Sequence, residues 1–167
     1  MEHRYLKIAL TLSVGLLALF YAAHNIVNWS SATGAVGYVL SQQDHAAYPV
    51  SLVPAITSSV AQALITGIIC LGEAAAAIVS LVGAWRLWSA RNADRPAFAA
   101  AKSTAVIGVG LAALVWFFLF AVFGGALYQM WQTEVGAQSL EGAWQYSGLS
   151  LLTLIYLSMA EGDIQAR

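Results

Sequence analysis

One acidic side chain within an apolar segment is the strongest chemical signal in the sequence. Glu73 lies near the middle of a long apolar stretch, where an ionised carboxylate is costly if lipid surrounds it. The nearest basic residue further along that stretch, Arg86, is thirteen positions away, or about 20 Å by helical rise. Glu73 is therefore expected to be protonated, hydrogen-bonded inside a helix bundle, or in contact with something outside this chain.

The neighbours of Glu73 at helical spacing leave two interpretations of its role open. Small and polar residues share its helix face, and close helix packing in lipid uses such a stripe. A structural Glu73 would be neutral and hydrogen-bonded to hydroxyl groups of a neighbouring helix. A functional Glu73 would be a proton relay, a ligand contact or a contact with a partner subunit. The other residues of the stripe are Ser59, Thr66, Cys70, Ala77, Ser80 and Ala84.

A second polar group follows the first apolar stretch and consists of His24, Asn25, Asn28 and Trp29. Helix capping and anchoring at the membrane interface explain these residue types. The alternative is a binding site for a lipid headgroup or a quinone ring, and a bound lipid or quinone is the only ligand that the sequence suggests.

Two other chemical possibilities are weaker. No two of the three histidines face each other from expected spanning helices, so we predict neither a haem nor a metal site. The sequence also lacks a phosphate-binding glycine loop, a metalloprotease helix motif and a nucleophile elbow, so we assign no catalytic residue.

The third apolar stretch is rich in aromatic residues. Trp116, Phe117 and Phe120 are candidates for a face that docks a partner helix. The alternative is that these rings face lipid or pack between helices of the same chain.

The elements that position these residues are four apolar stretches. They predict helices at about 8–27, 58–85, 104–128 and 144–160, because backbone groups in lipid must be paired within the segment. Of the 167 residues, 60% are hydrophobic and only 9% are charged, too few charges for a water-soluble surface. We therefore predict a single all-α domain over residues 1–167 that crosses the membrane four times. The fourth helix barely meets the length that a span requires.

The positions of the basic residues predict the orientation. The links at about 28–57 and 129–143 contain no Lys or Arg, so the positive-inside rule places both termini and the middle link in the cytoplasm. Within the first outer link, Ser30 and Ser31 are expected to cap a short amphipathic helix through Val36 and Leu40. The basic residues are Arg4, Lys7, Arg86, Arg91, Arg95, Lys102 and Arg167.

Several segments in order resemble a bacterial family of predicted small integral membrane proteins, the domain-of-unknown-function family 2165. This likeness covers nearly the whole chain and implies a multi-pass protein of the bacterial inner membrane, but no activity. The segments that carry it include Asn25-Ile26, Ala55-Ile56-Thr57-Ser58, Glu73-Ala74, Gly83-Ala84-Trp85-Arg86-Leu87, Gly124-Gly125 and Met130-Trp131-Gln132.

Three positions depart from the pattern of that family. Ala126-Leu127-Tyr128 stands in place of Glu-Trp-Phe, Tyr38 in place of a histidine, and His45-Ala46 in place of a threonine pair. If the family residues form a polar outer site, this member has altered or lost it.

Two classes of function remain. The small size and short links favour a non-catalytic accessory or scaffold subunit of a larger membrane complex, such as one of a respiratory or photosynthetic chain. The alternative is an autonomous small carrier or membrane enzyme that uses Glu73 as a proton or ligand site. Expected partners are membrane lipids and other membrane subunits. Nucleic acid is excluded, because the net charge of -1 offers no basic patch for phosphates.

Overall fold

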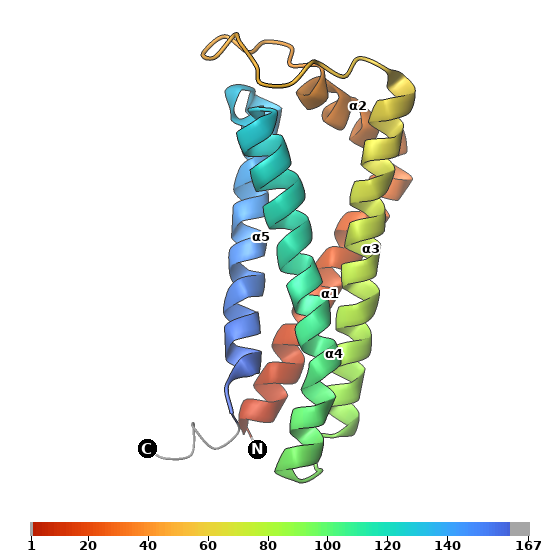
Figure 1. Cartoon of the computed structure of the whole chain (residues 1–167). Coiled ribbons are helices and arrows are strands. Elements are labelled where there is room, and N and C mark those ends of the chain that lie inside the picture. Colours follow the sequence, from red (N-terminus) through yellow and green to blue (C-terminus); the bar gives the residue numbers. More distant parts are fainter. Residues whose placement is uncertain (1, 161–167) are drawn as a thin grey trace.

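The computed structural model describes residues 2–160, and within that range it contains helices and connecting loops but no strand. Four long helical segments lie side by side, and a short helix, α2, crosses one end of the bundle (Figure 1). In chain order the elements are α1 (Glu2–Val27), α2 (Trp29–Leu40), α3 (Ser59–Ser89), α4 (Arg95–Leu114), the π-helix η1 (Val115–Leu127), the short 3-10 helix η2 (Met130–Gln132) and α5 (Glu134–Ser158).

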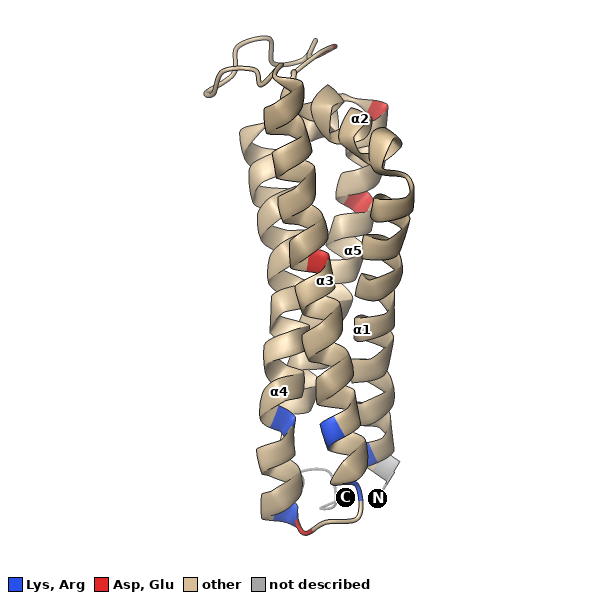
Figure 2. Ribbon diagram, turned by 90° about the vertical axis from the view of Figure 1, so that its right-hand side faces the viewer, with Lys and Arg blue, Asp and Glu red and all other residues tan. Residues whose placement is uncertain are grey.

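The two ends of the bundle differ in charge. We call one the basic end, because it holds all the described Lys and Arg residues: Arg4, Lys7, Arg86, Arg91, Arg95 and Lys102 (Figure 2). The other is the loop end, formed by α2, the loop of residues 41–58, and η2. These six basic residues are therefore grouped in space as expected from the sequence, and Arg167 lies outside the described residues.

Three helical segments are long and apolar enough to cross a membrane: His3–Val27, Ser59–Ser89 and Arg95–Leu127. The third comprises α4 and η1 as one continuous segment. The last long helix, α5, packs along this segment but is not among the three.

The start of α5 corrects the sequence prediction, which placed the fourth helix at 144–160. The helix begins ten residues earlier, at Glu134, and Thr133 caps it by accepting a hydrogen bond from the Gly136 amide at 3.1 Å. The polar residues before Trp144 do not form the predicted link but the exposed side of the first turns of α5.

Small residues allow α3 and α4 to approach closely. A Cβ atom added to Gly83 would lie 2.5 Å from the Cα atom of Ala105, and one added to Gly108 would overlap the backbone of Ser80. The predicted stripe on α3 is largely confirmed, because Thr66, Cys70, Glu73, Ala77, Ser80 and Ala84 are buried, although Ser59 is exposed.

The short helix predicted in the first link is confirmed as α2, but its predicted cap is wrong. Asn28 occupies the N-cap position and makes no side-chain capping bond. Ser30 and Ser31 lie inside the helix instead.

Candidate ligand cavity at the loop end

Glu73 is buried in the interior of the bundle, with only 1% of its surface exposed. The side-chain nitrogen Nδ2 of Asn25 donates a hydrogen bond to its Oε2 atom at 2.9 Å. The other carboxyl oxygen, Oε1, has no hydrogen-bond partner among the described residues. Glu73 thus has a hydrogen-bond partner on a neighbouring helix. The partner is an amide on α1, however, and not the predicted hydroxyl group.

The polar group at the end of α1 separates in the structure. Asn25 points inward to Glu73, whereas His24 and Trp29 are exposed. Asn28 is exposed as well and donates to the carbonyl oxygen of His24 at 2.9 Å. Only Asn25 is therefore brought to the intramembrane carboxyl group, and the other three do not form a site with it.

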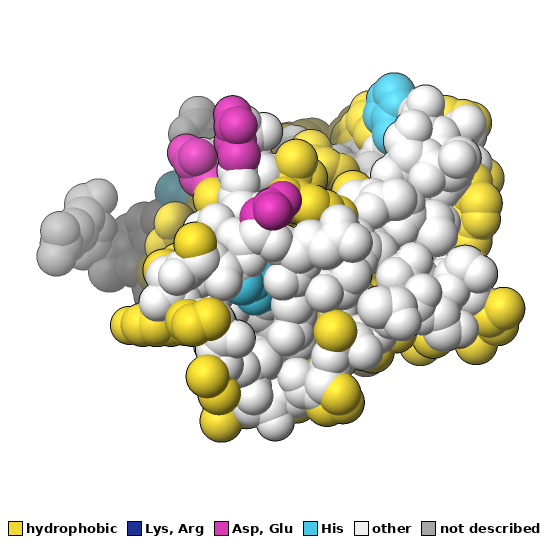
Figure 3. Space-filling model, turned by 90° about the horizontal axis from the view of Figure 1, so that it is seen from above, with side chains coloured by type: hydrophobic (Ala, Val, Ile, Leu, Met, Phe, Trp, Pro, Cys, Tyr) yellow, Lys and Arg dark blue, Asp and Glu magenta, His cyan; other side chains and the backbone are white. Residues whose placement is uncertain are grey.

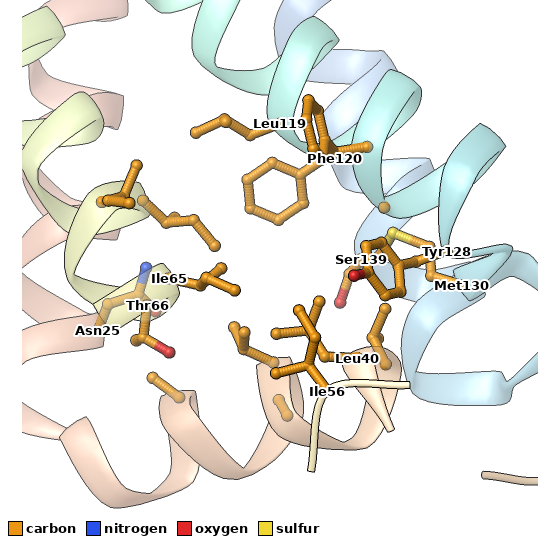
Figure 4. Close-up of a pocket in the computed structure, with 18 of the residues that line it drawn as sticks. Asn25, Leu40, Ile56, Ile65, Thr66, Leu119, Phe120, Tyr128, Met130 and Ser139 are labelled. Carbon is orange, nitrogen blue, oxygen red and sulfur yellow. The ribbon is translucent and has the colours of Figure 1, made fainter. Parts of the chain in front are cut away.

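A cavity of about 490 Å³ opens beside Asn25 at the loop end. Residues of α1, α2, α3, η1, η2, α5 and the loop of residues 41–58 line it. Its walls are mainly apolar, with Leu40, Ile56, Ile65 and Phe120 around the space (Figure 4). Cavities of about 300–1,000 Å³ with apolar walls and a few polar groups are typical of sites for small organic molecules.

Polar side chains occupy two opposite walls of this cavity. Asn25 and Thr66 lie on one side, and Tyr128 and Ser139 lie on the other (Figure 4). Thr66 and Ser139 donate their hydroxyl protons to backbone carbonyls one helical turn earlier, at 2.9 and 2.8 Å. The Tyr128 side chain is 8% exposed, and its hydroxyl group makes no hydrogen bond with any residue that the structure describes. Tyr128 is therefore a hydrogen-bond donor left available to a ligand.

The π-helix η1 supplies one wall of the cavity. Its wider turn ends where the Tyr128 amide donates to the carbonyl oxygen of Phe123, five residues earlier, at 2.9 Å. Such turns are rare and are frequently found at functional sites. No pattern in the sequence distinguishes the residues of η1 from those of an α-helix of similar composition.

The aromatic residues proposed to face a partner have three different environments. Trp116 is 3% exposed and packs edge-on against Tyr146 with a centroid distance of 4.0 Å, so the expectation that it faces a partner is wrong. Phe120 lines the cavity. Phe117 alone lies on the outer surface, where 42% of it is exposed.

Comparison with known protein families shows to which family the chain belongs. A family model described as "Predicted small integral membrane protein" (DUF2165) matches residues 3–160. The chain belongs to this family. The protein is accordingly a small integral membrane protein, and the resemblance inferred from its sequence is confirmed. No curated protein and no solved structure matches the chain.

None of the described Lys or Arg side chains lines the cavity. From above the loop end, acidic and histidine side chains are visible and no Lys or Arg is (Figure 3). Glu73, behind Asn25, contributes a carboxyl group next to the cavity. Across residues 2–160 no three His, Cys, Asp or Glu side chains come together as a metal site would require.

Proposed function

We propose that the protein crosses the bacterial inner membrane four times, with both termini in the cytoplasm. The span by α5 is supported by its length of 25 residues, or about 37 Å. It is supported further by the position of its two ends. The helix begins beside η2 at the loop end and finishes at the basic end, where Lys7 donates to the Met159 carbonyl oxygen at 2.9 Å.

Labelling with a membrane-impermeant thiol reagent tests this topology. In a background with Cys70→Ala, single cysteines at Gln138 and Ser158 report the two ends of α5, and one at Asn92 reports the α3–α4 loop. We expect labelling of the Gln138 variant alone in intact spheroplasts and of all three after lysis. Labelling of both the Gln138 and Ser158 variants before lysis would contradict the fourth span.

Within this topology, the protein binds an amphipathic molecule drawn from the outer leaflet. The cavity carries this proposal: about 490 Å³ of space with apolar walls and polar side chains at two opposite places. An empty apolar space of this size leaves its lining without the dispersion contacts of a close-packed interior. A bound lipophilic molecule supplies these contacts.

Native mass spectrometry of the purified protein tests ligand binding. Ala32 lines the cavity from α2, so Ala32→Phe fills part of the space. Ser31→Phe is the matched control, because it places the same ring on the exposed side of α2. We expect a bound lipophilic molecule on the wild-type and on Ser31→Phe, and its loss from Ala32→Phe. Equal ligand content in all three proteins would overturn the proposal.

A second candidate function, an accessory subunit of a larger membrane complex of an energy-converting chain, is favoured by a different surface. Phe117 on η1 and Trp144 on α5 are both exposed and pack edge-on at a centroid distance of 5.8 Å, and they form an aromatic face that a partner helix can cover. Purification from native membranes in mild detergent should yield a stoichiometric complex that Phe117→Ala weakens. A stable lone monomer from the same membranes would remove this candidate.

A further inference from the structure

The two opposite polar places in the cavity both offer hydrogen-bond donors. The Tyr128 hydroxyl group makes no bond with a described residue, although the side chain is 8% exposed. The Asn25 amide has two N–H groups, of which one is directed to Glu73. The second N–H group makes no hydrogen bond with another described residue. A ligand that satisfies both donors needs two acceptor atoms, such as the oxygens of two carbonyl groups.

The charges around the cavity exclude one class of ligand. The six described basic residues all lie at the basic end, whereas the cavity lies at the loop end (Figure 2). The carboxyl group of Glu73 lies 2.9 Å from the Asn25 nitrogen. An anionic headgroup in this cavity would be desolvated without any cation beside it, which is strongly unfavourable.

We infer that the cavity selects an uncharged amphipathic molecule whose two carbonyl oxygens accept hydrogen bonds from Tyr128 and Asn25. This rests on the proposed ligand-binding function. The apolar remainder of the molecule packs against Ile65, Leu119 and Phe120, which line the same cavity (Figure 4). A quinone ring and the ester groups of a neutral glycerolipid share this chemistry. Glu73 acts as a positioning residue, because its Oε2 atom holds the Asn25 amide.

Calorimetric titration of the detergent-purified, full-length protein tests the inference with three probes. These are a short-chain benzoquinone, a dioctanoylglycerol and a dioctanoyl phosphatidylglycerol. One of the two neutral probes should bind at least about tenfold more tightly than the anionic probe, equivalent to about 1.4 kcal/mol. Whichever neutral probe binds more tightly identifies the source of the carbonyl groups. Equal affinity for the anionic probe overturns the inference.

The donor residues are tested by conservative variants with a matched control. Tyr128→Phe keeps the ring and removes only the hydroxyl group, so binding of the neutral probe should weaken about tenfold. Tyr48→Phe makes the same change at an exposed position of the loop end outside the cavity, and its affinity should equal that of the wild-type. Glu73→Gln keeps a side-chain oxygen that can hold the Asn25 amide and Glu73→Ala does not, so only Glu73→Ala should weaken binding of the neutral probe. An unchanged affinity in Tyr128→Phe contradicts the inference.

Infrared spectroscopy of the bound neutral probe gives a readout that needs no variant. Its carbonyl stretch should lie at lower frequency on the wild-type protein than in an apolar solvent, and an unshifted band overturns the inference. The outcomes also separate the two proposals. If Ala32→Phe abolishes binding while the anionic probe binds as well as the neutral ones, ligand binding stands and the selectivity falls. If no probe binds and Ala32→Phe carries the same molecules as the wild-type, both fall.

Discussion

The basic end and the loop end are built from similarly apolar helices but differ in how closely these helices pack. Toward the basic end, Gly83 brings α3 against the backbone of Ala105, and Lys7 is fully buried as it donates to the Met159 carbonyl oxygen. At the loop end the helices surround a cavity of about 490 Å³. The hydrophobicity of the helices therefore does not determine how closely they pack. Small residues and buried end contacts accompany the close packing in one half, whereas bulky side chains of η1 line the cavity in the other.

The largest expected effect comes from enlarging the α3–α4 contact. Gly83→Leu should lower the free energy of unfolding by about 3 kcal/mol or more, because even a Cβ atom there meets the backbone of Ala105. Gly110→Leu on α4 is the control, since a Cβ atom at Gly110 meets nothing within 4 Å. Thermal unfolding in detergent measures both. A similar loss of stability in the two variants would show that the basic half is not closed by this contact.

A smaller effect is expected from the cation that ties α1 to the α3–α4 loop. Arg4 donates to the carbonyl oxygens of Arg91 and Ala93 at 2.9 and 2.6 Å and lies over the ring of Phe98. Arg4→Met should lower the free energy of unfolding by about 2 kcal/mol, since hydrogen bonds from charged groups are the stronger ones. Arg86→Met should cost about 0.5 kcal/mol, because Arg86 is exposed. The same melting experiment compares them, and equal losses would contradict a special role for Arg4.

The hydrogen bond between Asn25 and Glu73 should contribute about 1 kcal/mol to the free energy of unfolding. Asn25→Ala leaves both carboxyl oxygens of Glu73 without a hydrogen-bond partner among the described residues, because Oε1 already has none. Leaving such a group unpaired costs about 1–2 kcal/mol. In a double-mutant cycle, Asn25→Ala with Glu73→Ala should cost about 1 kcal/mol less than the sum of the single changes. Asn28→Ala, with Glu73→Ala, is the control pair and should be additive. Additivity in both pairs would mean that the Asn25–Glu73 contact does not matter to stability.

The sequence predicted the presence of the long helices and the charge asymmetry, because both depend on short-range patterns. It placed the starts of α4 and α5 nine and ten residues too late, at about 104 and 144 instead of Arg95 and Glu134. Apolar runs indicate helices wherever lipid is the solvent, and the links without Lys or Arg do lie together at one end. The buried face of α3 followed from helical periodicity alone. Periodicity also placed Glu73 in the interior, although it could not name Asn25 as the partner, since that contact joins residues 48 positions apart.

The cavity could not be predicted from short-range sequence patterns, because it depends on tertiary packing. Gly108 and Gly110 are glycines of the same apolar segment, yet a Cβ atom added to Gly108 would meet Ser80 of α3, whereas one added to Gly110 would meet nothing within 4 Å. Two positions along a helix turn the side chain by about 200°, and the sequence does not say which face meets a neighbour. The partner-facing expectation for Trp116 failed for the same reason. The π-helical turn that shapes the cavity carries no periodic signal that distinguishes it from an α-helix of similar composition.

The smallest expected effect concerns a contact between α2 and the loop of residues 41–58 at the loop end. On α2, the Tyr38 hydroxyl group donates to Oδ2 of Asp44 at 2.6 Å, and Asp44 has a left-handed backbone with φ 62. The hydrogen bond and the negative charge of Asp44 raise the pKa of Tyr38 above 10.0, because ionisation loses the bond and places two negative charges together. The contact therefore stabilises the folded loop at lower pH, and this contribution is lost as the pH rises through the pKa of Tyr38.

Asp44→Asn should lower the pKa of Tyr38 toward 10.0, because it removes the carboxylate. The phenolate absorbance of Tyr38 is obtained by subtracting the titration of Tyr38→Phe, measured with and without Asp44→Asn. Asp94→Asn, at the basic end, should leave the titration of Tyr38 unchanged. If the pKa of Tyr38 is the same with and without Asp44→Asn, the loop is not held against α2. A lower pKa of Tyr38 in Asp44→Asn would show that the Tyr38–Asp44 contact holds residues 38–44 in place. The cavity at the loop end would then be due to side-chain packing and not to a loose loop.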